Sequence, residues 1–297
     1  MSIQSVQSKY PNAIWFDSNH GSTGTGTVSD PYNNITTAIG DITSNDNVIA
    51  IKDGTHSITN IGGSSSTSSL SLGGTADTLT LVGVSTNAVL SSTGTGFGTL
   101  VNLSNKSYAI KIETLKAFLN GSTNNGVIYG GNGSSSDVTV EGCILEMGST
   151  LQASSTNYGF IRSSSSSTVI TLTVKNSIFI GAANPGELLI GFTGGFNTFD
   201  CQNNTIINAS GNATKVSRIG SFSGSSIFKN NIFVGTGTNN ETLGFTPSSA
   251  GGNCYHNTGI SSGSGGVVFA DPIFVDSTNG DYRLRPTSPC IGAGTAS

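Results

Sequence analysis

Apolar and polar residues alternate in short segments along most of this chain, and each segment ends at a residue that favours a turn. Residues 138–144 read VTVEGCI, and residues 172–178 read LTVKNSI. Alternation with a period of two predicts short β-strands that bury one face. The residue that ends each segment recurs along the chain at Asp53, Gly83, Thr114, Gly142, Asn176, Asn203, Asn230 and Asn253.

These turn residues return at intervals of 23 to 34 residues. Such self-similarity is typical of a solenoid, whose repeats bury their apolar faces by stacking on one another. An interval of this length with only strand patterning suits three short strands and three turns per coil. We therefore predict an all-β fold, a parallel β-helix solenoid of about eight coils with a short helical cap at the N-terminus and a second cap at the C-terminus.

The turn residues themselves predict sharp corners, because glycine and asparagine tolerate a left-handed backbone. An asparagine side chain can also bond to the equivalent asparagine one coil away. We expect a ladder at roughly 4.8 Å per coil, formed by Asn176, Asn203, Asn230 and Asn253.

Two terminal segments depart from the repeat. Residues 31–42 place Ile35, Ala38, Ile39 and Ile42 on one face of a short helix. This helix is expected to cover the first coil, where unpaired strand edges would otherwise invite aggregation. We divide the chain into an N-terminal cap (1–45), a parallel β-helix (46–260) and a C-terminal cap (261–297).

Glycine- and serine-rich insertions follow the corners, and we expect them to project from one side of the column. There they would either bind a ligand or serve only as tolerated surface loops. They span residues 62–69, 91–98, 120–136, 153–167 and 235–250.

Composition narrows the classes of partner. Only 9% of the residues are charged, against roughly 25% in an ordinary domain, and the 12 Lys and Arg are scattered. That distribution argues against nucleic acid. No apolar stretch approaches the ~18 residues of a membrane span. The N-terminal residues lack the apolar run of a secretory signal, so we expect synthesis in a cytosol unless a leader has been removed.

Four cysteines, Cys143, Cys201, Cys254 and Cys290, are too far apart for a zinc or redox motif. We expect small buried thiols in a β core, with a disulfide or a metal site as the alternatives.

One pair of acids could carry chemistry. Glu113 and Glu141 each precede a corner in adjacent coils, so their backbones should lie roughly 5 Å apart, close to the carboxylate separation of retaining glycosidases. The alternative is a surface charge ladder in which Glu141 pairs with Lys175. His20, His56 and His256 are too dispersed for a metal triad. We predict no metal or cofactor site.

Four segments resemble the right-handed parallel β-helix proteins of the pectate-lyase-like superfamily. Residues 15–21, WFDSNHG, and residues 30–39, DPYNNITTAI, are similar to the N-terminal cap of that family. Residues 48–56 are similar to its first coil, with His56 where Tyr is commoner, and residues 271–294 resemble its terminal phrase. The resemblance implies right-handed winding, in agreement with the general preference of parallel crossovers. It implies no single activity, because this fold hosts lyases, hydrolases, adhesins and phage spikes.

The resemblance also implies tests for two enzyme classes. Pectate lyases use a carboxylate cluster for calcium, whereas polygalacturonase-like hydrolases carry paired Asp, Gly-His-Gly and Arg-Ile-Lys motifs. The chain has neither an Asp-Asp pair nor a Gly-His-Gly, and Arg218-Ile219-Gly220 is the only trace of the third motif.

Two functions remain open, with a Thr- and Ser-rich ice-binding face as a third idea. The first is a non-enzymatic virion structural protein, such as a phage head fibre, decoration or tail-spike component, that attaches to host-surface polysaccharide. Its partners would be other virion proteins, and the resemblance makes a homotrimer an arrangement to test. Tyr129 and Tyr158, in the long insertions, are the candidates for stacking on sugar rings. The second is a polysaccharide lyase or glycoside hydrolase, extracellular if a leader was removed.

Overall fold

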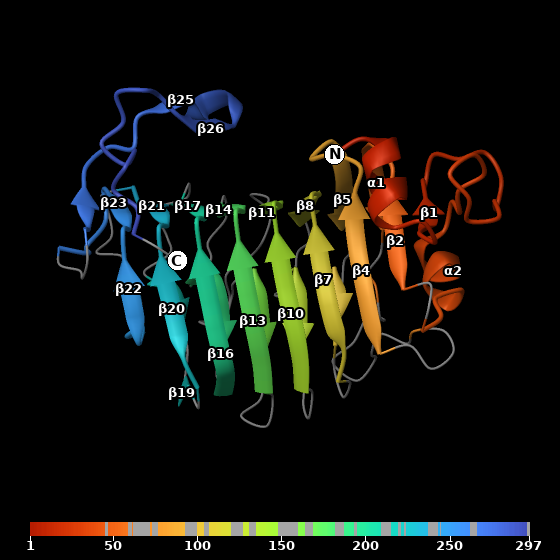
Figure 1. Ribbon diagram of the computed structural model, residues 1–297, viewed down its shortest axis with the longest axis horizontal. Helices are drawn as coiled ribbons and strands as arrows, with labels where there is room; N and C mark the ends of the chain where they lie inside the picture. Colours follow the sequence, from red (N-terminus) through yellow and green to blue (C-terminus); the bar gives the residue numbers. More distant parts are fainter. Residues whose placement is uncertain are drawn as a thin grey trace.

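The computed structural model of the chain is a parallel β-helix, a column of stacked coils with a helix-containing cap at one end and a hairpin near the other (Figure 1). The structure describes residues 1–44, 47–58, 61, 72, 77–92, 100–103, 107–119, 127–130, 135–147, 160–163, 169–181, 187–192, 195–208, 215–218, 221–222, 224–236, 243, 245–261 and 266–295.

Sheet A is the longest of the parallel sheets and forms the front face in Figure 1. Its strands run in the order β1 (Ile14–Phe16), β2 (Val48–Ile51), β4 (Thr78–Gly83), β7 (Ala109–Glu113), β10 (Ser135–Glu141), β13 (Val169–Lys175), β16 (Gly195–Gln202), β20 (Ser226–Lys229) and β22 (Ser249–Gly251), with β19 (Ser221–Phe222) paired to β16. From β2 to β22 the described strands mark eight coils, as the sequence predicted.

The strands of sheet B follow the corners of the coils. It contains β3 (Gly54–Ile58), β5 (Ala88–Ser92), β8 (Lys116–Leu119), β11 (Ile144–Met147), β14 (Ile178–Gly181), β17 (Thr205–Asn208), β21 (Ile232–Val234), β23 (Cys254–His256) and β24 (Val268–Phe269). Sheet C contains β6 (Val101–Asn102), β9 (Ile128–Gly130), β12 (Ile161–Ser163), β15 (Glu187–Phe192) and β18 (Lys215–Arg218). Within the described residues, sheet C gives a third strand to five of the eight coils, and the three parallel sheets confirm the prediction of an all-β parallel solenoid.

The interior of the column is apolar because alternate residues of each strand point inward. In β11, Leu145 and Met147 are buried while Ile144 and Glu146 are half-buried on the outside. Phenylalanine rings contribute to the core, where Phe160 and Phe179 meet edge to face at 5.1 Å between ring centroids, a favourable geometry for aromatic pairs.

The predicted left-handed corners are confirmed at five positions. Thr114, Gly142, Asn176, Asn203 and Asn230 have φ between 52° and 64°. Each corner N–H donates to the residue that precedes the next corner, as Asn203 N does to the carbonyl of Lys229 at 3.1 Å. The corners therefore continue the hydrogen-bonded stacking of the sheets.

The prediction was wrong at the other three positions. In the first coil the positive φ falls on Gly54 rather than Asp53, and in the last coil it falls on Gly252 rather than Asn253. Gly83 is not left-handed. Instead, a Cβ there would lie 2.2 Å from the carbonyl oxygen of Thr114, so glycine is needed for close approach of two backbones.

An asparagine ladder exists. Asn253 belongs to it as predicted, whereas its other three members lie one residue further along than predicted. It is formed by the buried side chains of Ser177, Asn204, Asn231 and Asn253, which we call the amide ladder. Asn204 Nδ2 donates to Asn231 Oδ1 at 3.0 Å, and Asn231 Nδ2 donates to Asn253 Oδ1 at 3.2 Å. The corner residue itself faces outward, so the residue after it points into the core.

The N-terminal cap contains two helices. The predicted apolar stripe lies on α2 (Ile35–Gly40) and just beyond it, with Ile35, Ala38, Ile39 and Ile42 buried in the main core. The helix begins at Asn34, whose side chain accepts from Thr36 N at 2.8 Å.

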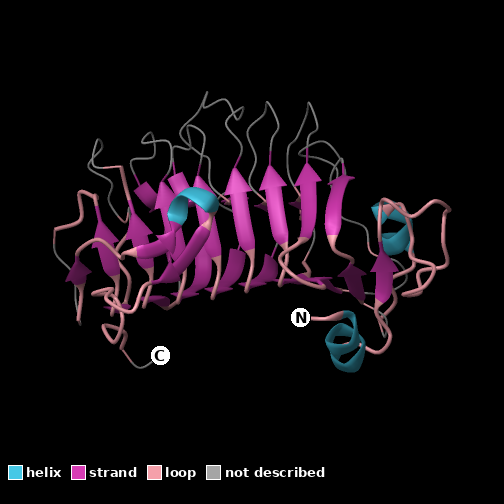
Figure 2. Cartoon of the chain, turned by 90° about the horizontal axis from the view of Figure 1, so that it is seen from above, coloured by secondary structure: helices cyan, strands magenta, loops and turns pink. Residues whose placement is uncertain are grey.

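A second helix, α1 (Ile3–Lys9), was not predicted. It begins with a capping box at Ser2 and buries only Val6. Val6 packs with Trp15, Ala50, Val82 and Val84 on the outer face of sheet A. Figure 2 shows α1 on the sheet A side of the column, and β1 extends that sheet into the cap.

The C-terminal segment forms an antiparallel hairpin, β25 (Phe274–Asp276) and β26 (Asp281–Leu284), joined by the short helix η1 (Ser277–Asn279). It lies over the outer face of sheet B (Figure 2), where Phe274 and Tyr282 line a hollow together with Ile207 and Val234.

The prediction of four buried thiols is correct for two of them. Cys143 and Cys201 are free and buried, and burial raises the pKa of the Cys143 thiol to about 12. Cys254 and Cys290 form a disulfide with Cα atoms 6.1 Å apart, the alternative that the spacing had left open. No helix of the described residues is long and apolar enough to cross a membrane.

Candidate functional site

The two candidate acids are neighbours on the outer face of sheet A. Glu113 on β7 pairs in register with Glu141 on β10, and Lys175, Gln202 and Lys229 continue the row. The shared position that the sequence predicted is therefore present, and the surroundings of each carboxylate decide what it can do.

Three donor side chains contact the Glu113 carboxylate, and only 5% of the residue is exposed. Lys9 Nζ contacts Oε1, and Tyr10 Oη donates to Oε2 at 2.6 Å. Lys111 Nζ lies 3.1 Å from Oε2. Burial by itself raises the pKa of Glu113, but the hydrogen bonds from Lys9, Tyr10 and Lys111 outweigh it and the pKa lies below the usual value. Glu113 therefore remains ionised and is poorly suited to donate a proton.

Glu141 is more open, with 43% of its side chain exposed. Lys111 Nζ lies 3.5 Å from Glu141 Oε2, so one lysine sits between the two glutamates. The expected partner Lys175 pairs instead with Asp200, at 2.7 Å between Nζ and Oδ2. The row is thus a network of opposite charges on one polar face.

The three histidines lie apart, as expected. His56 is fully buried: its Nδ1 accepts from Ser18 N at 3.1 Å and its Nε2 donates to the Lys52 carbonyl at 2.8 Å. His20 lies 2.9 Å from Asp30. Among the described residues no group of three His, Cys, Asp or Glu side chains could hold a metal ion.

Of the two tyrosines proposed for sugar stacking, the structure describes the backbone of Tyr129. We expected Tyr129 in a loop, but it lies in strand β9, in register with Asn102 and Arg162. Tyr158 and most of the glycine- and serine-rich insertions lie outside the described residues.

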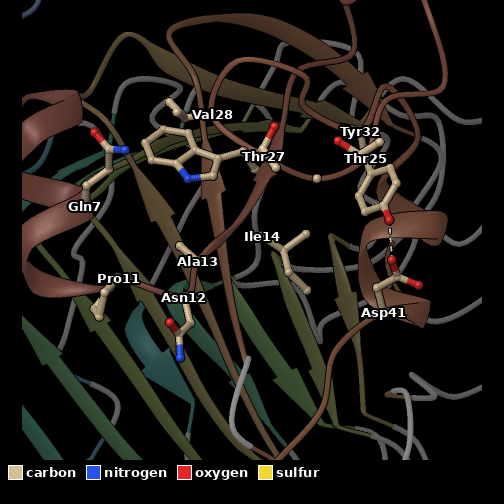
Figure 3. A pocket seen from close by; sticks show the side chains of 12 residues that line it. Gln7, Pro11, Asn12, Ala13, Ile14, Thr25, Thr27, Val28, Tyr32 and Asp41 are labelled. Carbon is tan, nitrogen blue, oxygen red and sulfur yellow. Dashed lines mark hydrogen bonds between the residues drawn. The ribbon is translucent and has the colours of Figure 1, made fainter.

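A hollow at the N-terminal end was not anticipated. It has a volume of about 600 Å³ and lies between α1, β1, the following loop and the end of α2 (Figure 3). We call it the N-terminal pocket. Its lining comprises Gln7, Pro11, Asn12, Ala13, Ile14, Trp15, Thr25, Gly26, Thr27, Val28, Tyr32 and Asp41.

Backbone pairing to β1 holds the wall of this pocket. Trp15 N donates to the Gly26 carbonyl at 2.8 Å, and Tyr32 N donates to the Trp15 carbonyl at 2.9 Å. Gly26 has a φ of 77°, and a Cβ there would lie 2.7 Å from the Tyr32 ring. A glycine at this position therefore lets Tyr32 reach the pocket.

The polar groups of the pocket are amides, hydroxyls and one carboxylate. Tyr32 Oη donates to Asp41 Oδ2, an interaction drawn in Figure 3. This hydrogen bond is the main reason that the pKa of Tyr32 is raised. Within the described part of the chain, the side-chain amides of Gln7 and Asn12 have no hydrogen-bond partner. Such groups around apolar walls can orient a small polar ligand.

Two of the other hollows border the column. One, of about 340 Å³, shares Pro11, Asn12 and Ala13 with the N-terminal pocket and extends to Lys9 and Thr80. The other, of about 360 Å³, lies under the C-terminal hairpin beside His256 and Asp271. The sequence offered one signal for the N-terminal pocket, the single Trp of the chain at residue 15.

Comparison with the models of known protein families and with curated proteins finds no match to this chain.

Proposed function

We propose that the chain is a non-enzymatic virion structural protein of the pectate-lyase-like superfamily, a phage head fibre, decoration or tail-spike component that attaches to host-surface polysaccharide. It would assemble with other virion proteins. The observation that carries the non-enzymatic part is the engagement of Glu113 by Lys9, Tyr10 and Lys111.

A retaining glycosidase needs one carboxyl group that holds a proton and a second that attacks the sugar. Glu113 is held as a carboxylate and faces the N-terminal residues rather than open solvent. The contacts of Glu113 with Lys9 and Tyr10 instead hold the first residues of the chain on sheet A. This arrangement supports a structural role for the only acid pair that the sequence singled out.

The attachment part of the proposal draws on the shape of the molecule. A continuous column of stacked coils is a rigid support, and the N-terminal pocket, at one end of the column, offers apolar walls and polar groups. A rigid site keeps the entropic cost of binding low.

The alternative is a polysaccharide lyase or glycoside hydrolase. The register of Glu113 against Glu141 favours it, because adjacent carboxylates are the pattern that sugar hydrolysis uses. For this pair to act, Lys9 and Tyr10 would have to leave Glu113.

The test is incubation of the purified chain with acidic and neutral polysaccharides, following reducing ends, the absorbance of unsaturated products and retention on each immobilised polymer. We expect retention without product. Product that disappears in Glu113→Gln or Glu141→Gln would establish the enzyme instead. Absence of both product and retention would overturn the attachment part.

A further inference from the structure

We infer that the N-terminal pocket is the binding subsite for a neutral, hydroxyl-rich sugar, and that the adjoining hollow beside Lys9 receives the next sugar of the same chain. This inference rests on the proposed function and specifies where, and for which class of glycan, attachment occurs.

The charge of the lining decides the ligand class. Among the described residues no lysine, arginine or histidine lines the N-terminal pocket, and the one carboxylate of its lining is Asp41. A uronic or sialic acid would find no cation there and would meet that carboxylate. A neutral sugar fits, because each hydroxyl can donate to Asp41 and accept from an amide N–H.

The unengaged amides are the groups that would bind. Gln7 projects from α1 and Asn12 from the segment that follows it, on one side of the pocket, while Asp41 lies on the opposite side (Figure 3). Gln7 and Asn12 have no hydrogen-bond partner among the described residues, and one Asp41 oxygen is already used by Tyr32. Donors and acceptors thus face a ligand from two sides.

The apolar part of the lining suits the faces of a sugar ring. Ala13, Ile14 and Val28 lie between these polar groups, and the pocket also reaches Trp15 and Tyr32. Sugar rings present C–H surfaces that pack on such side chains, while the hydroxyls at the ring edge reach the polar rim. A volume of about 600 Å³ is within the range of small-ligand sites.

The adjoining hollow extends the site toward the next sugar unit of the bound glycan. It shares Pro11, Asn12 and Ala13 with the pocket and continues to Thr80 on sheet A. Lys9 is the cation of its lining, and it is already paired with Glu113. An acidic sugar would have to compete with that pair, so the extension also favours neutral units.

The experiment is calorimetric titration of the full chain with three neutral probes, maltotriose, cellotriose and N,N′,N″-triacetylchitotriose, and with trigalacturonate as the acidic probe. We compare Gln7→Ala, Asn12→Ala and Asp41→Asn with Gln4→Ala, the matched control, since Gln4 is an exposed glutamine of the same helix that does not line the pocket. Each pocket variant should weaken binding of the preferred neutral probe by roughly 2- to 10-fold, and Gln4→Ala should leave it unchanged. The melting temperature of each variant verifies folding.

The outcomes separate this inference from the proposed function. Binding of a neutral probe that survives all three pocket variants would place the glycan elsewhere and overturn the inference alone. Equal or tighter binding of trigalacturonate would overturn the neutral class. If neither the probes nor the intact polysaccharides bind, both the inference and the attachment function fail.

Discussion

A row of polar side chains passes through the interior of the later coils. Ser177, Asn204, Asn231 and Asn253 are each about 1% exposed, and each amide bonds to a neighbouring coil and to a backbone carbonyl. Asn231 Nδ2, for example, also donates to the Cys201 carbonyl at 3.0 Å. Buried amides are tolerated only when their bonding groups are satisfied, so the members of the row depend on one another.

We expect Asn231→Ala to lower the free energy of unfolding by about 1–3 kcal/mol, because it removes the acceptor of the buried Asn204 backbone N–H and the side-chain donor to the Cys201 carbonyl. Chemical denaturation measures this change. Asn203→Gly is the control, since it removes an exposed amide at a corner and keeps a residue that accepts positive φ; it should cost a few tenths of a kcal/mol. Equal losses in both variants would contradict the role assigned to the ladder.

The second residue-scale prediction concerns pH. The pKa of Glu113 in the folded chain lies below the usual value of 4.5, so the folded state binds this proton less readily than the unfolded state does. Its contribution to stability is therefore present above pH ~4.5 and is lost as the pH falls through the lower, folded pKa. Melting temperatures of the wild type should drop more steeply in that acid range than those of Glu113→Gln. Glu141→Gln, which replaces the neighbouring and more exposed carboxylate, is the matched control.

At this scale the sequence predicted the type of residue better than its position. Alternation along a strand correctly places Leu172 and Val174 in the core, but Asn176 has a φ of 53° and breaks the alternation. The next residue, Ser177, then points inward. Counting by two cannot detect that shift, and three of the four predicted ladder members were therefore one residue early. The engagement of Glu113 by Lys9 depends on a contact across 104 residues, which no local pattern reveals.

At the scale of elements, the two N-terminal helices differ in how they are stabilised. α2 buries Ile35, Ala38 and Ile39 against the first coil, and that stripe is visible in the sequence. α1 has seven residues and buries only Val6, too few for a periodic pattern. A helix so short is marginal in isolation, so its packing on sheet A and the contacts of Lys9 and Tyr10 hold it in place.

We expect Val6→Ala to destabilise α1 by roughly 1–2 kcal/mol, the value of about two buried CH₂ groups. Amide hydrogen exchange of residues 6–10 should accelerate while exchange in β10 stays slow. Ile3→Ala, at a position that is 39% exposed, is the matched control and should change neither. Uniform acceleration through the column would show that α1 is not an independently opening segment.

At the scale of the whole molecule, chain segments from both ends fold back on the column. The N-terminal residues cover part of sheet A, and the C-terminal hairpin covers part of sheet B. Repeats and capping phrases made the solenoid predictable, because each coil has the same local requirements. The pocket was not predictable, because its walls come from α1, β1 and α2, which only the folded cap brings together.

The disulfide carries the whole-molecule prediction. Cys254 and Cys290 are 36 residues apart, and Thr295 beyond them bonds to Asn230 at 2.8 Å. Reduction should lower the free energy of unfolding by about 2–4 kcal/mol. Denaturation with and without reductant measures it, and Cys290→Ser should show the same loss with no further response to reductant. An unchanged wild type would mean that the tail is held without the bond.

The amide ladder also limits how this column could grow. The position after the corner is Leu115 and Cys143 in two earlier coils, and it becomes Ser177 and then three asparagines. Duplication of the coil that carries Asn204 would place one amide beside another and lengthen the column without a break. A copy of the coil that carries Leu115, inserted beside Asn204, would instead interrupt the row. The asparagine amides next to the inserted coil would then lose their hydrogen-bond partner in the neighbouring coil. The coils of this protein are alike in shape, but one coil cannot replace another at every position of the column.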